Sequence, residues 1–180
     1  MSRSAANGGV GWLQGRLSRF GRAAFGERLA GFIYGTIVVL SVLVAGSRAF
    51  PHDAWRIVLM VVVTVTVFWV AHVYAHALAY GVAHDERLSR ARIREIAERE
   101  ASVVLAAVPP FVALVLGALG VMSTSAAVWA AFGLGLVVLG AQGIVVARVE
   151  RLGHSATIGV VAANLGLGLV LVALKLLVTH

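Results

Sequence analysis

Long apolar runs separated by short polar segments dominate the chain, and their lengths predict helices that cross a membrane. A helix needs about 20 apolar residues to span a bilayer. Continuous apolar runs favour helices over the alternating strands of a membrane barrel. Five runs are long enough, and each lacks acidic residues: 29–47, 55–79, 102–122, 126–147 and 156–178. The fold class expected is therefore an all-α integral membrane protein, a bundle of five transmembrane helices.

The composition agrees with this fold class. Of the 180 residues, 60% are hydrophobic and 13% are charged, whereas soluble domains average about 45–50% and about 25%. The absence of cysteine excludes disulfides, thiolate metal sites, iron–sulfur clusters and cysteine nucleophiles. The net charge of +7 comes without a recognisable nucleic-acid-binding motif, so no nucleic-acid partner is expected.

Arginines gather at one end of the predicted spans. Twelve of them precede the first span or lie between spans two and three or between four and five, whereas only Arg48 and Arg56 lie in loops at the other end. The positive-inside rule therefore predicts a cytoplasmic N-terminus and a C-terminus outside. Arginine outnumbers lysine 14 to 1, a skew typical of high-GC bacterial genomes. We expect a multi-pass protein of the bacterial cytoplasmic (inner) membrane, in contact with the lipid bilayer.

The chain divides into a basic N-terminal segment, 1–27, and a transmembrane domain, 28–180. Within the first segment, apolar side chains share one helical face while arginines turn away from it: Leu13, Leu17, Phe20 and Ala24. This pattern predicts an amphipathic helix lying on the inner leaflet. A basic tail that only sets the topology is the alternative.

The cytoplasmic segment 84–101 carries five arginines and five acids. It is expected to form a solvated helix that continues from the second span. Glu86–Arg90 and Glu95–Arg99 have the i,i+4 spacing and order that stabilise such a helix.

Small residues recur at four-residue spacing in the apolar runs: Gly31/Gly35, Ala113/Gly117, Ala127/Ala131/Gly135 and Gly159/Ala163. Such stripes let helix backbones approach closely in lipid. We expect some of them to face another copy in a homo-oligomer, with packing inside one chain as the alternative. Pro109 and Pro110 predict a kink or local unwinding in the third span.

The second span carries the candidate chemistry. At 100° per residue, its polar and aromatic side chains fall within an arc of about 80°: Trp69, His72, His76 and Tyr80. His84 extends the series to the cytoplasmic end. We expect His72 just past mid-bilayer, with His76 one turn further in. Because ionisable groups are costly in hydrocarbon, this face is the candidate functional site.

Three hypotheses fit this face. The first is a proton or small-ion path, since histidine exchanges protons near neutral pH and Trp69 beside it could gate the path. The second is a non-catalytic assembly or accessory protein, whose polar face packs helices together or docks another membrane protein. The third is a metal or haem protein in which His72 and His76 bind zinc, copper or haem. Further ligands are hard to find, so no cofactor is expected. No catalytic residue is identified, and a non-enzyme is favoured.

Gln142 and Asn164 are the other polar side chains that need a partner in lipid. Because a short loop joins spans four and five, we expect the two amides to bond each other. The absence of acids from every run argues against a proton-coupled pump or carrier. Five spans cannot form two equal inverted repeats, and this also argues against a proton-coupled carrier.

The start of the first span resembles, in part, a motif of the small prokaryotic relatives of the endolysosomal potassium channels. That family opens its first helix with Arg…Phe-Ser-Asp and carries aromatic–histidine clusters later. Arg28…Phe32-Ile33-Tyr34 occupies the place of the motif without its Ser-Asp pair, and Phe68-Trp69…His72 is similar to the later clusters. Since the defining pair is absent, no residue role is carried over.

Overall fold

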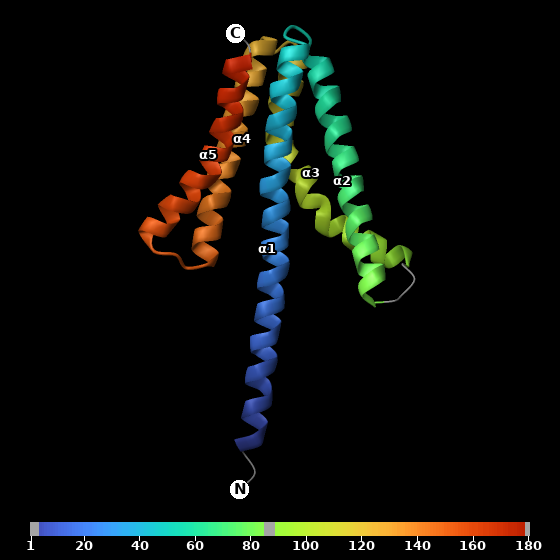
Figure 1. The fold of residues 1–180 in the computed structure, drawn as a ribbon, viewed down its shortest axis with the longest axis vertical. Coiled ribbons are helices and arrows are strands. Elements are labelled where there is room, and N and C mark those ends of the chain that lie inside the picture. The colour runs from blue at the N-terminus through green and yellow to red at the C-terminus, as the bar shows by residue number, and fades with distance from the viewer. Residues whose placement is uncertain (1–3, 85–88, 179–180) are drawn as a thin grey trace.

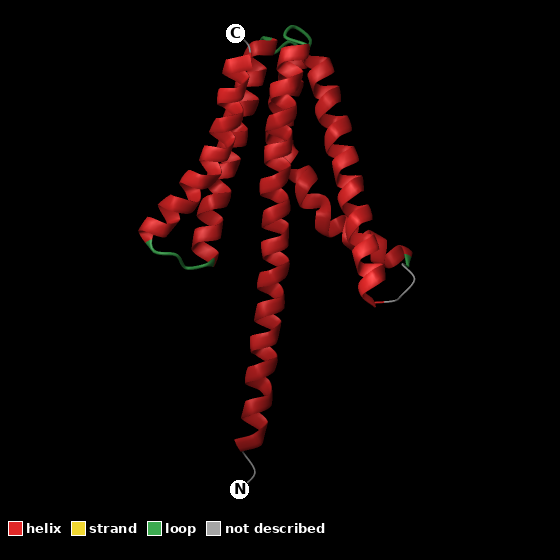
Figure 2. Cartoon of the chain, in the orientation of Figure 1, coloured by secondary structure: helices red, strands yellow, loops and turns green. Residues whose placement is uncertain are grey.

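The computed structural model describes residues 4–84 and 89–178, with side chains for 25–83, 89–174 and 176–177. These residues form five helices, with no strand among them (Figure 1, Figure 2). The helices are α1 (Ser4–Ala49), α2 (Ala54–His84), α3 (Arg90–Ala118), α4 (Thr124–Val149) and α5 (His154–Val178). The all-helical fold expected from the sequence is confirmed.

Each helix contains a segment long and apolar enough to cross a membrane: Phe25–Ala49, Ala54–Ala83, Arg90–Ala118, Thr124–Val149 and His154–Leu174. The chain is therefore built as a multi-pass membrane protein. The third span ends at Ala118, four residues before the predicted end. Gly120 takes a positive φ of 79° there, and the Val121 N–H donates to the Leu116 carbonyl at 3.0 Å. This left-handed turn terminates helices because glycine adopts it without steric cost.

The charged segment belongs to α3, and the expectation that it continues α2 is wrong. The Arg92 N–H donates to the Ser89 hydroxyl at 3.2 Å, which caps a new helix beginning at Arg90. The expected pair of Arg99 with Glu95 is confirmed, whereas Glu86 lies outside the described residues. The charged residues thus form the first turns of the helix that becomes the third span.

Two prolines interrupt the hydrogen-bond ladder of α3 without unwinding it. The helix is continuous through Pro109 and Pro110. It changes direction between its first turns beside α2 and its last turns behind α1 (Figure 1). The structure therefore shows a bend rather than the local unwinding that the sequence left open.

Helix α1 stands at the centre and contacts all four other helices. α2 lies on one side of it, α4 and α5 on the other, and the two termini lie at opposite ends (Figure 1). The first turns of α1 project along its axis beyond the other helices, with no break between them and the span (Figure 1). Residues 12–24 are thus no separate helix, and their placement on a membrane surface stays a prediction.

The helices converge at the end that carries the α1–α2 and α3–α4 loops and spread apart toward the other end (Figure 1). Fully buried apolar side chains fill the converging half: Val39, Leu40, Leu43, Ile57, Val61, Leu114 and Phe132. The opposite, spread end carries the arginine-rich segments. Two grooves lie toward the spread end, one on each side of α1 (Figure 1).

The small-residue stripes are used within the chain. A Cβ added at Gly35 would lie 2.7 Å from the Val103 carbonyl oxygen of α3, and one at Gly117 would collide with Ala127 of α4. By contrast, a Cβ at Gly159 on α5 would meet no described atom within 4 Å. Intrachain packing therefore accounts for the stripes on α1 and α3, and the homo-oligomer stays a prediction.

Candidate functional site

The first groove lies between α1, α2 and α3 and encloses about 730 Å³. We call it the histidine groove. Its polar lining comes from all three helices: Glu27, Tyr34, His72, His76, Tyr80, Arg99 and Glu100. Aliphatic side chains complete it, namely those of Ala30, Ile33, Ile37 and Ile96. Three members of the predicted face of α2, His72, His76 and Tyr80, therefore line a groove on the bundle. Across from them lie groups of α1 and α3 that the sequence did not assign to the site.

A hydrogen bond between a histidine and a carboxylate joins α2 and α3, two of the three helices that form the groove. His76 Nδ1 lies 2.8 Å from Glu100 Oε1, with the His76 side chain 55% exposed and the Glu100 side chain 17% exposed. The carboxylate accepts this bond, so Nδ1 carries the proton and Nε2 keeps a free lone pair. Glu100 was missing from the sequence-derived site because it was counted in a cytoplasmic loop. As part of α3, it becomes the main partner of His76.

His72 is held one turn above His76. Its Nδ1 lies 3.2 Å from the Phe68 carbonyl oxygen of the preceding turn, which again leaves Nε2 as the free nitrogen. Its ring centroid lies 4.4 Å from that of Phe68 and 5.8 Å from that of Tyr34. The two imidazole centroids are 6.2 Å apart, edge to face. Aromatic packing therefore fixes the His72 ring, and the hydrogen bond to Glu100 fixes the His76 ring.

The remaining members of the predicted face have different roles. Tyr80 lines the groove, and the Arg92 guanidinium stacks 4.7 Å from its ring centroid. Trp69 is not among the lining residues, and its indole N–H donates to the Ala97 carbonyl at 3.2 Å. It therefore ties α2 to the first turns of α3. The side chain of His84 lies outside the described residues.

His76 lies beside the charged first turns of α3. Its partner Glu100 is the last charged residue before the apolar part of that helix. The depth of His72 and His76 in a bilayer stays a prediction.

The two amides do not bond each other as expected. Gln142 Nε2 donates to Thr36 Oγ1 of α1 at 3.5 Å, and Asn164 Nδ2 donates to the Leu139 carbonyl at 3.4 Å. Gln142 is buried, and its Oε1 has no hydrogen-bond partner among the described residues. Each amide therefore joins a different pair of helices, α1 with α4 and α4 with α5.

The described residues hold no group of three or more histidine or carboxylate side chains placed to bind a metal ion. His76 and Glu100 provide two such ligands, and the aromatic contacts of His72 turn it toward Tyr34 and Phe68. The metal hypothesis for His72 and His76 thus lacks a ligand set. Comparisons with protein-family models, curated proteins and solved structures found no match. Function is therefore argued from the geometry of the groove.

Proposed function

We propose that the protein conducts protons, or another small cation, along a path whose inner half is the histidine groove. The observation that carries the proposal is the His76–Glu100 pair between two helices, with His72 one turn above it. Histidine and carboxylate side chains are the groups that most often exchange protons in proteins. Here both types line the same groove and bond each other.

The exchange uses the free nitrogen of each ring. A proton entering from the spread end binds His76 Nε2, and the resulting imidazolium is stabilised by the carboxylate of Glu100. Passing one proton through a bridging water to His72 Nε2 returns His76 to its neutral form. The Nδ1 bonds to Glu100 and to the Phe68 carbonyl stay in place throughout. His76 thus gains one proton and passes on one proton. His72 holds the proton at Nε2 until the outer half of the path opens and water there accepts it, which returns His72 to its neutral form.

The outer half of the proposed path would cross the packed side chains of the bundle. Val39, Leu40, Ile57 and Phe132 are fully buried beyond the groove. Conduction therefore requires a movement that separates these side chains. Among the three helices that line the histidine groove, α2 is the best candidate, because 22% of its most apolar segment is buried, against 33% for α1 and 39% for α3. We propose that displacement of α2 opens the path and that this structure is the closed state.

Proton flux into liposomes tests the proposal. Purified protein is reconstituted with an entrapped pH-sensitive dye, and a potassium gradient with valinomycin supplies the driving force. His76→Ala and Glu100→Gln are expected to lower the flux at least about tenfold, since general acid–base groups contribute factors of about 10²–10⁴. His154→Ala removes an exposed histidine at the start of α5, outside the residues that line the groove. It should leave the flux unchanged.

Two outcomes would overturn the proposal. One is wild-type liposomes that acidify no faster than protein-free liposomes. The other is equal flux in the wild type and both groove variants. A membrane protein that co-purifies stoichiometrically and is lost in the same variants would instead support the accessory role.

A further inference from the structure

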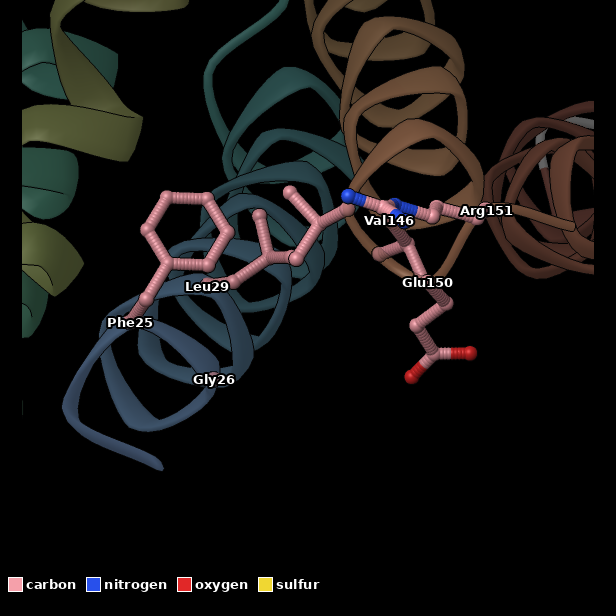
Figure 3. A pocket seen from close by; sticks show the side chains of 7 residues that line it. Phe25, Gly26, Leu29, Val146, Glu150 and Arg151 are labelled. Atoms are coloured by element: carbon pink, nitrogen blue, oxygen red, sulfur yellow. The ribbon is translucent and has the colours of Figure 1, made fainter. Parts of the chain in front are cut away.

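A second groove lies on the other side of α1, between α1 and α4, and encloses about 820 Å³ (Figure 3). We call it the α1–α4 groove. α1 contributes Phe25, Gly26 and Leu29, and the end of α4 with the following loop contributes Val146, Val149, Glu150 and Arg151. It shares no lining residue with the histidine groove. The ligand of the α1–α4 groove is therefore inferred from its own lining residues, independently of the histidine groove.

The walls of this groove are apolar. Phe25 and Leu29 project from α1, and Val146 lies across from them on α4 (Figure 3). Phe25 is 40% exposed and Val149 is 43% exposed. These side chains lie at the end of the bundle where the arginine-rich segments begin, so they border the headgroup region of a surrounding bilayer. A hydrocarbon chain fits such walls, whereas a hydrophilic metabolite would leave them uncovered.

One cation lines the groove together with the apolar walls. In the view of Figure 3 the Arg151 side chain extends toward the apolar side chains, while the Glu150 carboxylate points away from them. Among the ion pairs of the described residues, none involves Arg151. Its backbone has a φ of 52°, so the chain turns sharply as it leaves α4. The groove thus combines an unpaired guanidinium with a hydrocarbon surface.

We propose that the α1–α4 groove binds an anionic phospholipid from the leaflet at the arginine-rich end. An acyl chain lies between Phe25, Leu29 and Val146, and the phosphate accepts hydrogen bonds from Arg151. A guanidinium can donate two parallel bonds to phosphate oxygens. Basic pockets between membrane helices on the cytoplasmic side are typical binding sites for anionic headgroups.

The same charge selects among lipids. A zwitterionic choline lipid also has a phosphate, but its trimethylammonium group is repelled by Arg151 and its net charge is zero. Inorganic phosphate offers the anion without a chain for the apolar walls. The groove should therefore prefer phosphatidylglycerol to both, because only that ligand satisfies the guanidinium and the walls together.

Native mass spectrometry on the full-length protein tests this preference. The protein is delipidated and then mixed with equal amounts of dioleoylphosphatidylglycerol and dioleoylphosphatidylcholine. The wild type should retain phosphatidylglycerol with a preference of about tenfold or more, the size of a single charge-assisted contact. Arg151→Gln should abolish the preference. Arg94→Gln is the matched control, because it removes the same charge from an exposed arginine on α3 and should keep the preference.

A second variant tests the walls separately. Val149→Gln changes a partly exposed wall residue and leaves Arg151 intact, so the fold should tolerate it. It should weaken retention of phosphatidylglycerol, and inorganic phosphate should not raise the Tm of the wild type. The proposal is overturned if Arg151→Gln retains phosphatidylglycerol as the wild type does. The Tm of the wild type is also measured with phosphatidylglycerol. The proposal is overturned if inorganic phosphate alone raises the Tm as much as this lipid does.

Discussion

Gly35→Ala tests how α1 is held against α3, one turn along α1 from Gly31, which lines the histidine groove. An added Cβ would lie 2.7 Å from the Val103 carbonyl oxygen, 3.0 Å from its Cα and 3.1 Å from Ala106 Cβ. Two of these three neighbours are backbone atoms, which cannot move by rotating a side chain. To regain ordinary contact at 3.4 Å, the two helices must separate by about 0.7 Å at this point.

That separation of the two helices determines how much unfolding free energy Gly35→Ala loses. A gap of about 0.5–1 Å forfeits a quarter to a half of each van der Waals contact along the interface. Overpacking of this kind usually costs about 1–3 kcal/mol of unfolding free energy. Alanine also favours the helix over glycine by up to about 1 kcal/mol, which acts in the opposite direction. A control must therefore share that gain without the collision.

Gly133→Ala is this control. Gly133 lies within α4, and a Cβ there would meet no described atom within 4 Å. The helix-propensity gain is common to both variants, so it cancels when their unfolding free energies are subtracted. We expect Gly35→Ala to be less stable than Gly133→Ala by about 1–3 kcal/mol. The measurement is reversible unfolding by dodecyl sulfate in mixed micelles, followed by circular dichroism. Equal stabilities within about 0.5 kcal/mol would refute the close α1–α3 contact.

Three further predictions concern buried polar groups and access. Gln142→Leu should leave the unfolding free energy unchanged or raise it by about 1 kcal/mol in the same assay, because it removes a buried acceptor without a partner; a clear loss would mean that Oε1 is bonded in the membrane. A double-mutant cycle with His76→Ala and Glu100→Gln should give a coupling below about 1 kcal/mol, since the exposed half of the His76 side chain is screened by water; a larger value would place the pair away from water. In this chain without cysteine, Tyr34→Cys should react with an impermeant maleimide added at the arginine-rich side, and fully buried Leu40→Cys should react from neither side; labelling of Tyr34→Cys from the opposite side would contradict the position of the groove.

The sequence predicted the helices well because apolar run length is a direct requirement of spanning lipid. It placed the start of the charged helix less well, because residues 84–101 fit a helix joined to either neighbouring span. The decisive signal was Ser89, a residue type that commonly caps helices. Once α3 begins at Arg90, its first turns return alongside the last turns of α2. Glu100 then lies at about the same height as His76. The position of the helix start therefore predicts Glu100 as the partner of His76.

The same reasoning explains the error on the two amides. Residues at equal distances from the connection of two antiparallel helices lie at equal heights. Leu139 lies ten residues before the end of α4, and Asn164 lies ten residues after the start of α5, so these two meet. Gln142 lies three residues nearer to the loop than Leu139 and bonds Thr36 of α1 instead. Counting residues from the loop places Gln142 and Asn164 at different heights along their helices, so it predicts no bond between them. The sequence-based prediction paired them only because both are amides in neighbouring spans.

The wedge shape of the bundle follows from where close contacts between helices are possible. In the converging half, Gly46 approaches Ile57 and Gly135 approaches Leu40, so α1 packs tightly against α2 and α4. At the spread end, a Cβ added at Gly26 or Gly159 would meet no described atom within 4 Å. Charged side chains at that end need water, and helices that spread there let water in. One arrangement thus leaves the polar groove with the His76–Glu100 pair on one side of α1 and the groove with apolar walls on the other.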